Sequence, residues 1–425
     1  MQQGSLVFVG LNYPPEPTGI APYTGGLAAR VAGEGIDASV VTAFPHYPAW
    51  TFGPKTPPRT STEVLNGVRV TRLRHVLPKK PVGLLRLLSE LSFGVRAVLA
   101  PWRGPDVVVL VSPALFSSAV AMLRVRLARR RVSSVTWVQD LYSLGLEETG
   151  RGGGLASKVV RRVEKWLLRR SDAVVVIHDR FKQHVVRELG VPEDRVAVIR
   201  NWSHVSAPDR IDRRAVRDGL GWKHDEVVVL HAGNMGVKQG LENVVRAAQL
   251  ADEQGAPIRF VLLGGGNQQD RLQSIGAGVD RLDFLDSLPD EEFNAAMNSA
   301  DVLLVNEAPG ISGMAVPSKL TSYFSTGLPV LASTEPGSVT EFEVLSAGAG
   351  ASVRAGDPQA LLEAALDMGA DRTAAEEFGR SAREFLREHL TADAAFHKFS
   401  DLLQSLRPGR FETLSSAAHH QTRID

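Results

Sequence analysis

The chain has 425 residues, with 48 Lys and Arg against 47 Asp and Glu, and no cysteine. This length favours two domains over one core. The balanced charge does not suggest a general nucleic-acid binder, and the lack of cysteine excludes disulfides and thiolate metal sites. No run of about 18 apolar residues is present, and residues 1–10 lack the pattern of a signal peptide. We therefore expect a soluble, cytoplasmic, globular protein.

Short β-branched runs alternate with helical segments through the first half of the chain. Most of the runs are apolar on both faces, which is typical of a parallel sheet covered by helices. We predict helices at 157–170 and 180–189 and strands at 5–10, 37–41, 68–73, 106–111, 134–138, 172–177 and 195–199. This order predicts a doubly wound α/β domain.

Positive charge is concentrated in this first half. Between Arg72 and Arg170, 19 Lys and Arg stand against six Asp and Glu. Residues 158–170 place apolar side chains at helical spacing between arginines. An anionic membrane surface or an anionic lipid-linked substrate fits this pattern. A solvated helix that packs its apolar stripe on a sheet fits it as well.

The strand–helix alternation restarts after a polar stretch at 201–225. We predict strands at 226–233, 258–266, 280–285, 301–305, 328–333 and 350–353, then helices at 374–390 and 392–406. The predicted fold class is α/β, with two facing Rossmann-like domains and ligand sites at the carboxyl ends of the strands, in the cleft between the domains. The predicted domains are 1–205 and 206–385, followed by a helical segment at 386–407 and a flexible tail at 408–425.

Two loops that follow first strands have the composition of a phosphate site. The stretch GLNYPPEPTGIAPYTGGLA (10–28) leads through Glu16 and Gly19 into a helix, whose free amides favour an anion. The stretch HAGNMGVKQGLENVVRAA (231–248) places Lys238 among glycines, where it can neutralise a diphosphate. An ordinary turn and a solvated lysine are the structural alternatives.

Two further loops in the second half are candidates for the same ligand. LLGGGNQQDRL (262–272) offers Gly265 for close approach of a base or phosphate, or makes a plain turn. In GISGMAVPSKLTSYFSTGLPVLAS (310–333), Pro317 and Ser318 have the pattern of a helix start, with Lys319 beside it. A capped helix without a ligand is the alternative.

The sequence lacks the motifs of metal sites, serine nucleophiles and dehydrogenases. The eleven histidines show no HxxxH or HExxH spacing, so no metal site is expected. A GxSxG nucleophile turn is missing, and the first loop is not the GxGxxG fingerprint of a dehydrogenase.

The chain resembles the family 4 retaining glycosyltransferases, most closely the bacterial exopolysaccharide, O-antigen and colanic-acid branch. The matching stretches are NYPPEPTGIAPYTGGLA, TAFPHYPAW (42–50), Asn201-Trp202, GNMGVKQGLENVVRAA and PSKLTSYFSTGLPVLAS, in the expected order. The resemblance implies two facing Rossmann domains, no metal, and transfer of a sugar from a nucleotide diphosphate sugar to a glycan acceptor held by the first domain.

The resemblance implies roles for individual residues. Lys238 matches the lysine of the basic pair that stabilises the leaving diphosphate; the position of its arginine partner holds Asn234, and we expect Lys319 to replace it. Gln139 and Asp140 stand where a histidine is common and are expected to face the donor sugar or the acceptor hydroxyl. The expected substrate-binding residues are Glu16, Gly19, Asn201, Gly233, Asn234, Gly265, Pro317, Ser318 and Ser322.

The sequence also departs from the family pattern. Many relatives carry two glutamates eight residues apart before the GxPV turn, and the second holds the ribose. These positions are Met314 and Ser322 here, so the ribose contact cannot be carried over. A non-catalytic nucleotide-sugar-binding subunit and a sugar-nucleotide epimerase of the same fold therefore remain alternatives. The expected partners are a nucleotide diphosphate sugar, a polyprenyl diphosphate-linked glycan and an anionic membrane surface at the inner face of the plasma membrane.

Overall fold

The computed structural model divides the chain into two compact units. The first comprises Met1–Trp202 together with Ala392–Asp425, and the second comprises Ser203–Thr391. The structure describes residues 4–16, 19–47, 49–79, 83–128, 130–148, 154–202, 211–311 and 319–414. The domain boundary predicted at 205/206 lies outside these ranges.

The first unit is built on an eight-stranded sheet in the order β3-β4-β2-β1-β5-β6-β7-β8. All neighbouring strands are parallel except β3, which pairs antiparallel with β4. The strands are β1 (Ser5–Gly10), β2 (Asp37–Ala43), β3 (Thr60–Leu65), β4 (Val68–Leu73), β5 (Val107–Val111), β6 (Ser133–Val138), β7 (Ala173–Val176) and β8 (Val196–Val198). The seven predicted strands are thus present, and β3 is an additional edge strand.

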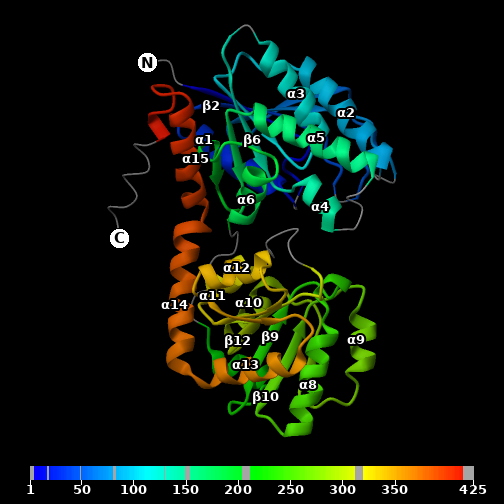
Figure 1. The fold of residues 1–425 in the computed structure, drawn as a ribbon, viewed down its shortest axis with the longest axis vertical. Helices are drawn as coiled ribbons and strands as arrows, with labels where there is room; N and C mark the ends of the chain where they lie inside the picture. The colour runs from blue at the N-terminus through cyan, green and yellow to red at the C-terminus, as the bar shows by residue number, and fades with distance from the viewer. Residues whose placement is uncertain are drawn as a thin grey trace. The chain divides into compact units, whose positions relative to one another are not determined.

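Helices cover both faces of this sheet (Figure 1). Phe93, Met122 and Leu167 anchor α2, α3 and α5 on one face, and Leu27 and Phe399 anchor α1 and α15 on the other. The helices are α1 (Ala21–Gly33), α2 (Gly83–Leu99), α3 (Leu115–Leu127), α4 (Tyr142–Glu148), α5 (Leu155–Arg170), α6 (Asp179–Arg187) and α15 (Ala392–Leu406), with a 3-10 turn η1 at Glu193–Arg195.

The second unit contains a six-stranded parallel sheet in the order β11-β10-β9-β12-β13-β14. This is the doubly wound order of the Rossmann fold. Its strands are β9 (Val227–Ala232), β10 (Ile258–Leu263), β11 (Leu282–Leu285), β12 (Val302–Asn306), β13 (Val330–Thr334) and β14 (Gly350–Arg354). Its helices are α7 (Arg213–Leu220), η2 (Val237–Gln239), α8 (Glu242–Gln254), α9 (Gln269–Ile275), α10 (Asp290–Ser299), α11 (Lys319–Thr326), α12 (Val339–Ser346), α13 (Pro358–Ala370) and α14 (Arg372–His389).

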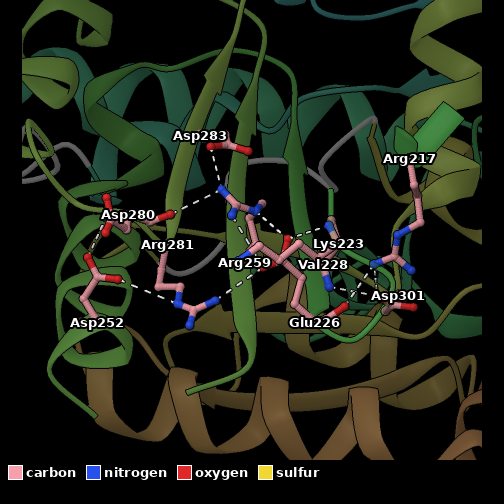
Figure 2. A network of polar contacts seen from close by, with 10 residues as sticks. All are labelled: Arg217, Lys223, Glu226, Val228, Asp252, Arg259, Asp280, Arg281, Asp283 and Asp301. Atoms are coloured by element: carbon pink, nitrogen blue, oxygen red, sulfur yellow. Dashed lines mark hydrogen bonds and ion pairs between the residues drawn. The ribbon is translucent and has the colours of Figure 1, made fainter. Parts of the chain in front are cut away.

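A charged network ties the amino ends of these strands together (Figure 2). The buried carboxylate of Glu226 accepts hydrogen bonds from Arg259 at 2.6 Å and from the backbone N of Lys223 at 2.9 Å. Asp301 accepts from Arg217 at 3.0 Å and from the backbone N of Val228 at 2.8 Å. The network lies at the edge of the sheet opposite to the carboxyl ends, so it serves the fold rather than the predicted ligand site.

The end of the described chain belongs to the core of the first unit. Phe396, Phe399 and Leu403 of α15 are buried there, and so are Phe411 and Leu414. A flexible tail was predicted from residue 408 onward; in its described part, up to residue 414, two apolar side chains are fully buried. No helix in the described ranges is long and apolar enough to cross a bilayer.

Candidate active site

Two glycine loops meet at the carboxyl edge of the sheet in the second unit. β9 ends at Ala232, and Gly233 follows with φ 128°, donating its N–H to the carbonyl of Leu263 at 2.8 Å. The backbone N of Met235 donates to the carbonyl of Gly265 at 2.8 Å. Gly233 and Gly265, which were predicted from separate motifs, therefore belong to one pair of touching loops.

The pairing depends on glycine at position 264. A Cβ on Gly264 would lie 2.2 Å from the carbonyl oxygen of Gly233, and its φ is 130°, outside the range that L side chains readily adopt. The two loops can therefore approach this closely only because this residue has no side chain.

Lys319, the first residue of α11, points its amine at this loop pair. Its Nζ lies 3.2 Å from Nε2 of His231 on β9 and 3.6 Å from the place of a Cβ on Gly233. His231 is fully buried, and burial lowers its pKa well below the usual value, so its neutral ring can accept a hydrogen bond from the ammonium. Burial also lowers the pKa of Lys319 to about 7, while the nearby charge of Glu307 acts to raise it.

Lys238 lies in η2, on the loop that follows β9, and its side chain is exposed. Its carbonyl accepts from the backbone N of Ala308 at 2.9 Å, and Nδ2 of Asn306 donates to the carbonyl of Gln239 at 2.7 Å. These contacts fix the backbone of the turn. Within the described residues no carboxylate forms an ion pair with Lys238, so its ammonium is available to an external anion.

Asn234 and Ser322, which were also predicted in this unit, each make a hydrogen-bond contact within their own loop or helix. Nδ2 of Asn234 lies 3.4 Å from Oε1 of Gln239 on the same loop. Ser322 is half-buried in α11, and its carbonyl accepts from Oγ of Ser325. Pro317 and Ser318 lie outside the described residues, as does Met314.

In the first unit, Gln139 and Asn201 form a reciprocal amide pair. Nε2 of Gln139 donates to Oδ1 of Asn201 at 3.0 Å, and Nδ2 of Asn201 donates back at 2.7 Å. The two residues follow β6 and β8 at the carboxyl edge of the sheet. Asp140 comes next in the chain, is exposed, and its carbonyl accepts from Oγ of Ser112 at 3.3 Å. Three predicted residues thus gather at one edge.

The side chain of Glu16 joins the opening loop to the loop after β2. The carboxylate of Glu16 is buried and accepts hydrogen bonds from the backbone N of His46 at 2.8 Å, the backbone N of Tyr47 at 2.9 Å and the amide of Asn12 at 2.8 Å. Oε1 accepts from both backbone amides and Oε2 accepts from Asn12, so in this structure Glu16 holds the backbone of residues 46 and 47. Its contact with the substrate stays a prediction. Gly19 has φ 68° and lies just before α1.

The comparisons with known proteins cover both units. Residues 18–202 match the glycosyl transferase 4-like domain, and residues 212–385 match the glycosyl transferases group 1 model. The chain is 31% identical over 338 residues to the putative colanic acid biosynthesis glycosyl transferase WcaI of Escherichia coli K12, covering 76% of this chain and 81% of the relative.

The chain belongs to the GT-B glycosyltransferases.

Solved structures confirm the fold of this glycosyltransferase. Sucrose-phosphate synthase from Thermosynechococcus elongatus matches with a TM-score of 0.66 at 19% identity, over 95% of this chain and 99% of that one. HepE from Anabaena, solved in complex with UDP, matches with a TM-score of 0.64 at 15% identity, over 94% and 100%. At these identities the likeness shows the fold alone.

The structure of the glycosyltransferase adds residues that the sequence reasoning passed over. Nε2 of His231 lies 3.2 Å from the amine of Lys319, and the charge of Glu307 acts on the same amine, although neither residue was predicted as part of the site. A histidine in an otherwise apolar strand was the available signal. In the first unit, Glu90 accepts from the hydroxyl of Tyr142 at 2.7 Å and lies 3.3 Å from Arg86, and no sequence motif links these three positions.

Proposed function

We propose that the glycosyltransferase moves a hexose from a nucleotide diphosphate sugar to a glycan acceptor, with retention at the anomeric carbon and without a metal. The observation that carries the proposal is the half-buried amine of Lys319, which lies against Gly233 where two glycine loops meet at the carboxyl edge of a Rossmann sheet. Backbone loops at this edge are where doubly wound sheets bind ligands.

The chemistry follows from the charge that develops in the reaction. Breaking the anomeric C–O bond leaves the bonding electrons on the diphosphate, so a site with pre-placed positive groups stabilises the leaving group. Lys319 and Lys238 supply two ammonium groups from separate elements of the second unit. A HepE structure holds UDP-glucose, which supports a nucleotide-sugar donor for this fold.

The acceptor assignment is part of the same proposal. WcaI is described as acting in colanic acid biosynthesis, which supports cell-surface polysaccharide assembly for this chain too. A polyprenyl diphosphate-linked glycan at the inner face of the plasma membrane is the acceptor class that best suits the basic first unit. In the first unit, Gln139, Asp140 and Asn201 are the polar residues proposed to face the transferred sugar or the acceptor hydroxyl.

A nucleotide panel followed by product analysis tests the proposal. One of UDP, GDP, ADP and dTDP is expected to raise the melting temperature, because a ligand that binds only the folded state stabilises it. The matching sugar nucleotide should then give transfer that survives EDTA, with the donor anomer kept in the proton NMR spectrum of the product. An inverted product would reject retention, and an epimerised donor without acceptor would favour the epimerase alternative.

The variant Lys238→Ala tests the role of the exposed lysine. We expect kcat/KM to fall by about 10²–10³-fold, the loss typical of removing one group that stabilises developing negative charge. Lys223→Ala is the matched control, since this exposed lysine precedes β9 at the opposite edge of the same sheet. Turnover of Lys238→Ala close to that of the control would remove Lys238 from the mechanism.

A further inference from the structure

Helix α2 carries an apolar stripe on the side that faces away from the core. Leu84, Leu88, Val95 and Leu99 recur at helical spacing and are 82%, 51%, 53% and 80% exposed. On the opposite side of the helix, Phe93 is fully buried over the sheet. Single exposed leucines are normal on a protein surface, but a stripe that spans about 22 Å of helix marks an interaction surface.

The two neighbouring helices extend this stripe into a face. α2 packs on α3, and α3 packs on α5, in the layer that covers one side of the sheet (Figure 1). Leu127 of α3 is 82% exposed and Leu155 of α5 is 80% exposed. Leu123 and Val159, four residues along from these two, are also exposed. We refer to the outer side of α2, α3 and α5 as the three-helix face.

The charges on the three-helix face have one sign. Lys158, Arg162 and Arg169 of α5 are exposed, and within the described residues neither Lys158 nor Arg162 pairs with a carboxylate. The two carboxylates that these helices carry point inward: Glu90 is hydrogen-bonded to Tyr142, and Glu164 accepts from the backbone N of Tyr142. The outer surface therefore offers apolar and cationic groups together.

We infer that the three-helix face docks on an anionic lipid bilayer. Apolar side chains that enter the interface, with lysines and arginines able to reach the headgroups, are the features that bind a helix layer to an anionic membrane. A second copy of the chain would bring two basic faces together, which like-charge repulsion opposes. The inference rests on the proposed function only for its purpose, which is to bring the enzyme to a lipid-linked acceptor.

Co-sedimentation of the full chain with vesicles tests this inference directly. We expect the chain to pellet with phosphatidylglycerol vesicles at low salt and to stay in the supernatant with pure phosphatidylcholine. Leu84→Ser combined with Leu99→Ser should weaken partitioning at least about tenfold for each leucine. Lys158→Gln combined with Arg162→Gln should weaken it about 30-fold, since each basic residue near such a surface contributes about a factor of five.

Matched control variants distinguish binding through the three-helix face from nonspecific adsorption of the chain to vesicles. Val64→Ser combined with Leu345→Ser alters exposed apolar residues elsewhere, and Arg372→Gln combined with Arg380→Gln alters exposed basic residues of α14. Neither control should change partitioning. A wild-type chain that stays in the supernatant, equal losses in the controls, or a dimer in sedimentation equilibrium that Leu84→Ser with Leu99→Ser dissociates would each overturn the inference.

The inference and the proposed function can fail separately. The leucine variant should keep the nucleotide-induced rise in melting temperature, because the nucleotide contacts are proposed for the second unit. A chain that binds vesicles but shows no rise with any nucleotide would refute the donor assignment and leave the docking face standing. A chain that melts at a higher temperature with a nucleotide but does not bind vesicles would refute the docking face and leave the donor assignment standing.

Discussion

At the scale of single residues, the half-buried amine of Lys319 is the feature with the clearest chemical consequence. Its pKa is lowered from 10.5 to about 7, chiefly by burial. Between these two values the unfolded chain binds the extra proton and the folded chain does not, so this group makes the unliganded protein more stable as the pH rises from about 7 to 10.5. His231 stays neutral throughout, since its own pKa is lowered well below the usual value.

This shift predicts that nucleotide binding takes up a proton. A diphosphate beside Lys319 favours the ammonium, so the affinity of the best nucleotide should fall as pH rises above about 7, by up to tenfold per pH unit. Calorimetry in buffers of different ionisation enthalpy measures both the affinity and the proton uptake.

Two variants define this test. Lys319→Met should bind more weakly and without the pH dependence. Lys238→Met should bind more weakly but keep the pH dependence, because this variant leaves Lys319 and its lowered pKa in place. Wild-type affinity that stays constant between about pH 7 and pH 9 would show that Lys319 does not contact the nucleotide.

At the scale of elements, the contact between the loops after β9 and β10 shapes the candidate site. We expect Gly264→Ala to lower the free energy of unfolding of the second unit by at least about 2 kcal/mol, because the new Cβ meets the carbonyl of Gly233 and the φ is unfavourable for alanine. Nucleotide binding should weaken as well, since Gly233 must move. Urea unfolding followed by far-UV circular dichroism measures the change.

Gly219→Ala is the matched control for this substitution. Gly219 lies in α7, and a Cβ there meets nothing within 4 Å. Alanine in an open helical position should raise stability by about 0.5–1 kcal/mol. A Gly264→Ala protein as stable as this control would mean that the two loops do not need their close approach.

At the scale of the whole molecule, the chain leaves the first unit and returns to it. α14 belongs to the second unit, whereas α15 completes the core of the first. Phe399 is fully buried, with its ring centroid 4.9 Å from that of Trp137 on β6. We expect Phe399→Ala to destabilise the first unit by about 3–5 kcal/mol and to leave the second unit unchanged.

Hydrogen exchange read by mass spectrometry distinguishes the two units. Peptides from residues 4–202 should lose protection in Phe399→Ala, while peptides from 211–391 should match the wild type and keep their response to nucleotide. Equal loss of protection in both units would mean that they unfold as one cooperative body.

The sequence by itself determined the fold class and most of the strands. Buried parallel strands need apolar residues on both faces. Runs such as Val107–Val111 could therefore be predicted as strands without knowing which strands lie beside them. The edge strand β3 was not predicted, because its residues are mostly exposed and its pairing with β4 is what makes it a strand. The pattern of glycines and lysines after strands predicts Gly233, Gly265, Lys238 and Lys319 as site residues, and this stays a prediction.

Only the tertiary structure decided what surrounds those residues. The 3.2 Å approach of Lys319 to His231 joins positions 88 residues apart, and the lowered pKa of the lysine comes from burial that no local pattern records. The structure also shows that Oε1 of Glu16 accepts hydrogen bonds from the backbone N of His46 and of Tyr47, some 30 residues away, which its own loop does not reveal. Local composition predicts which elements form, because propensity and periodicity act within a few residues; the partners of a buried polar group depend on the packing of distant segments.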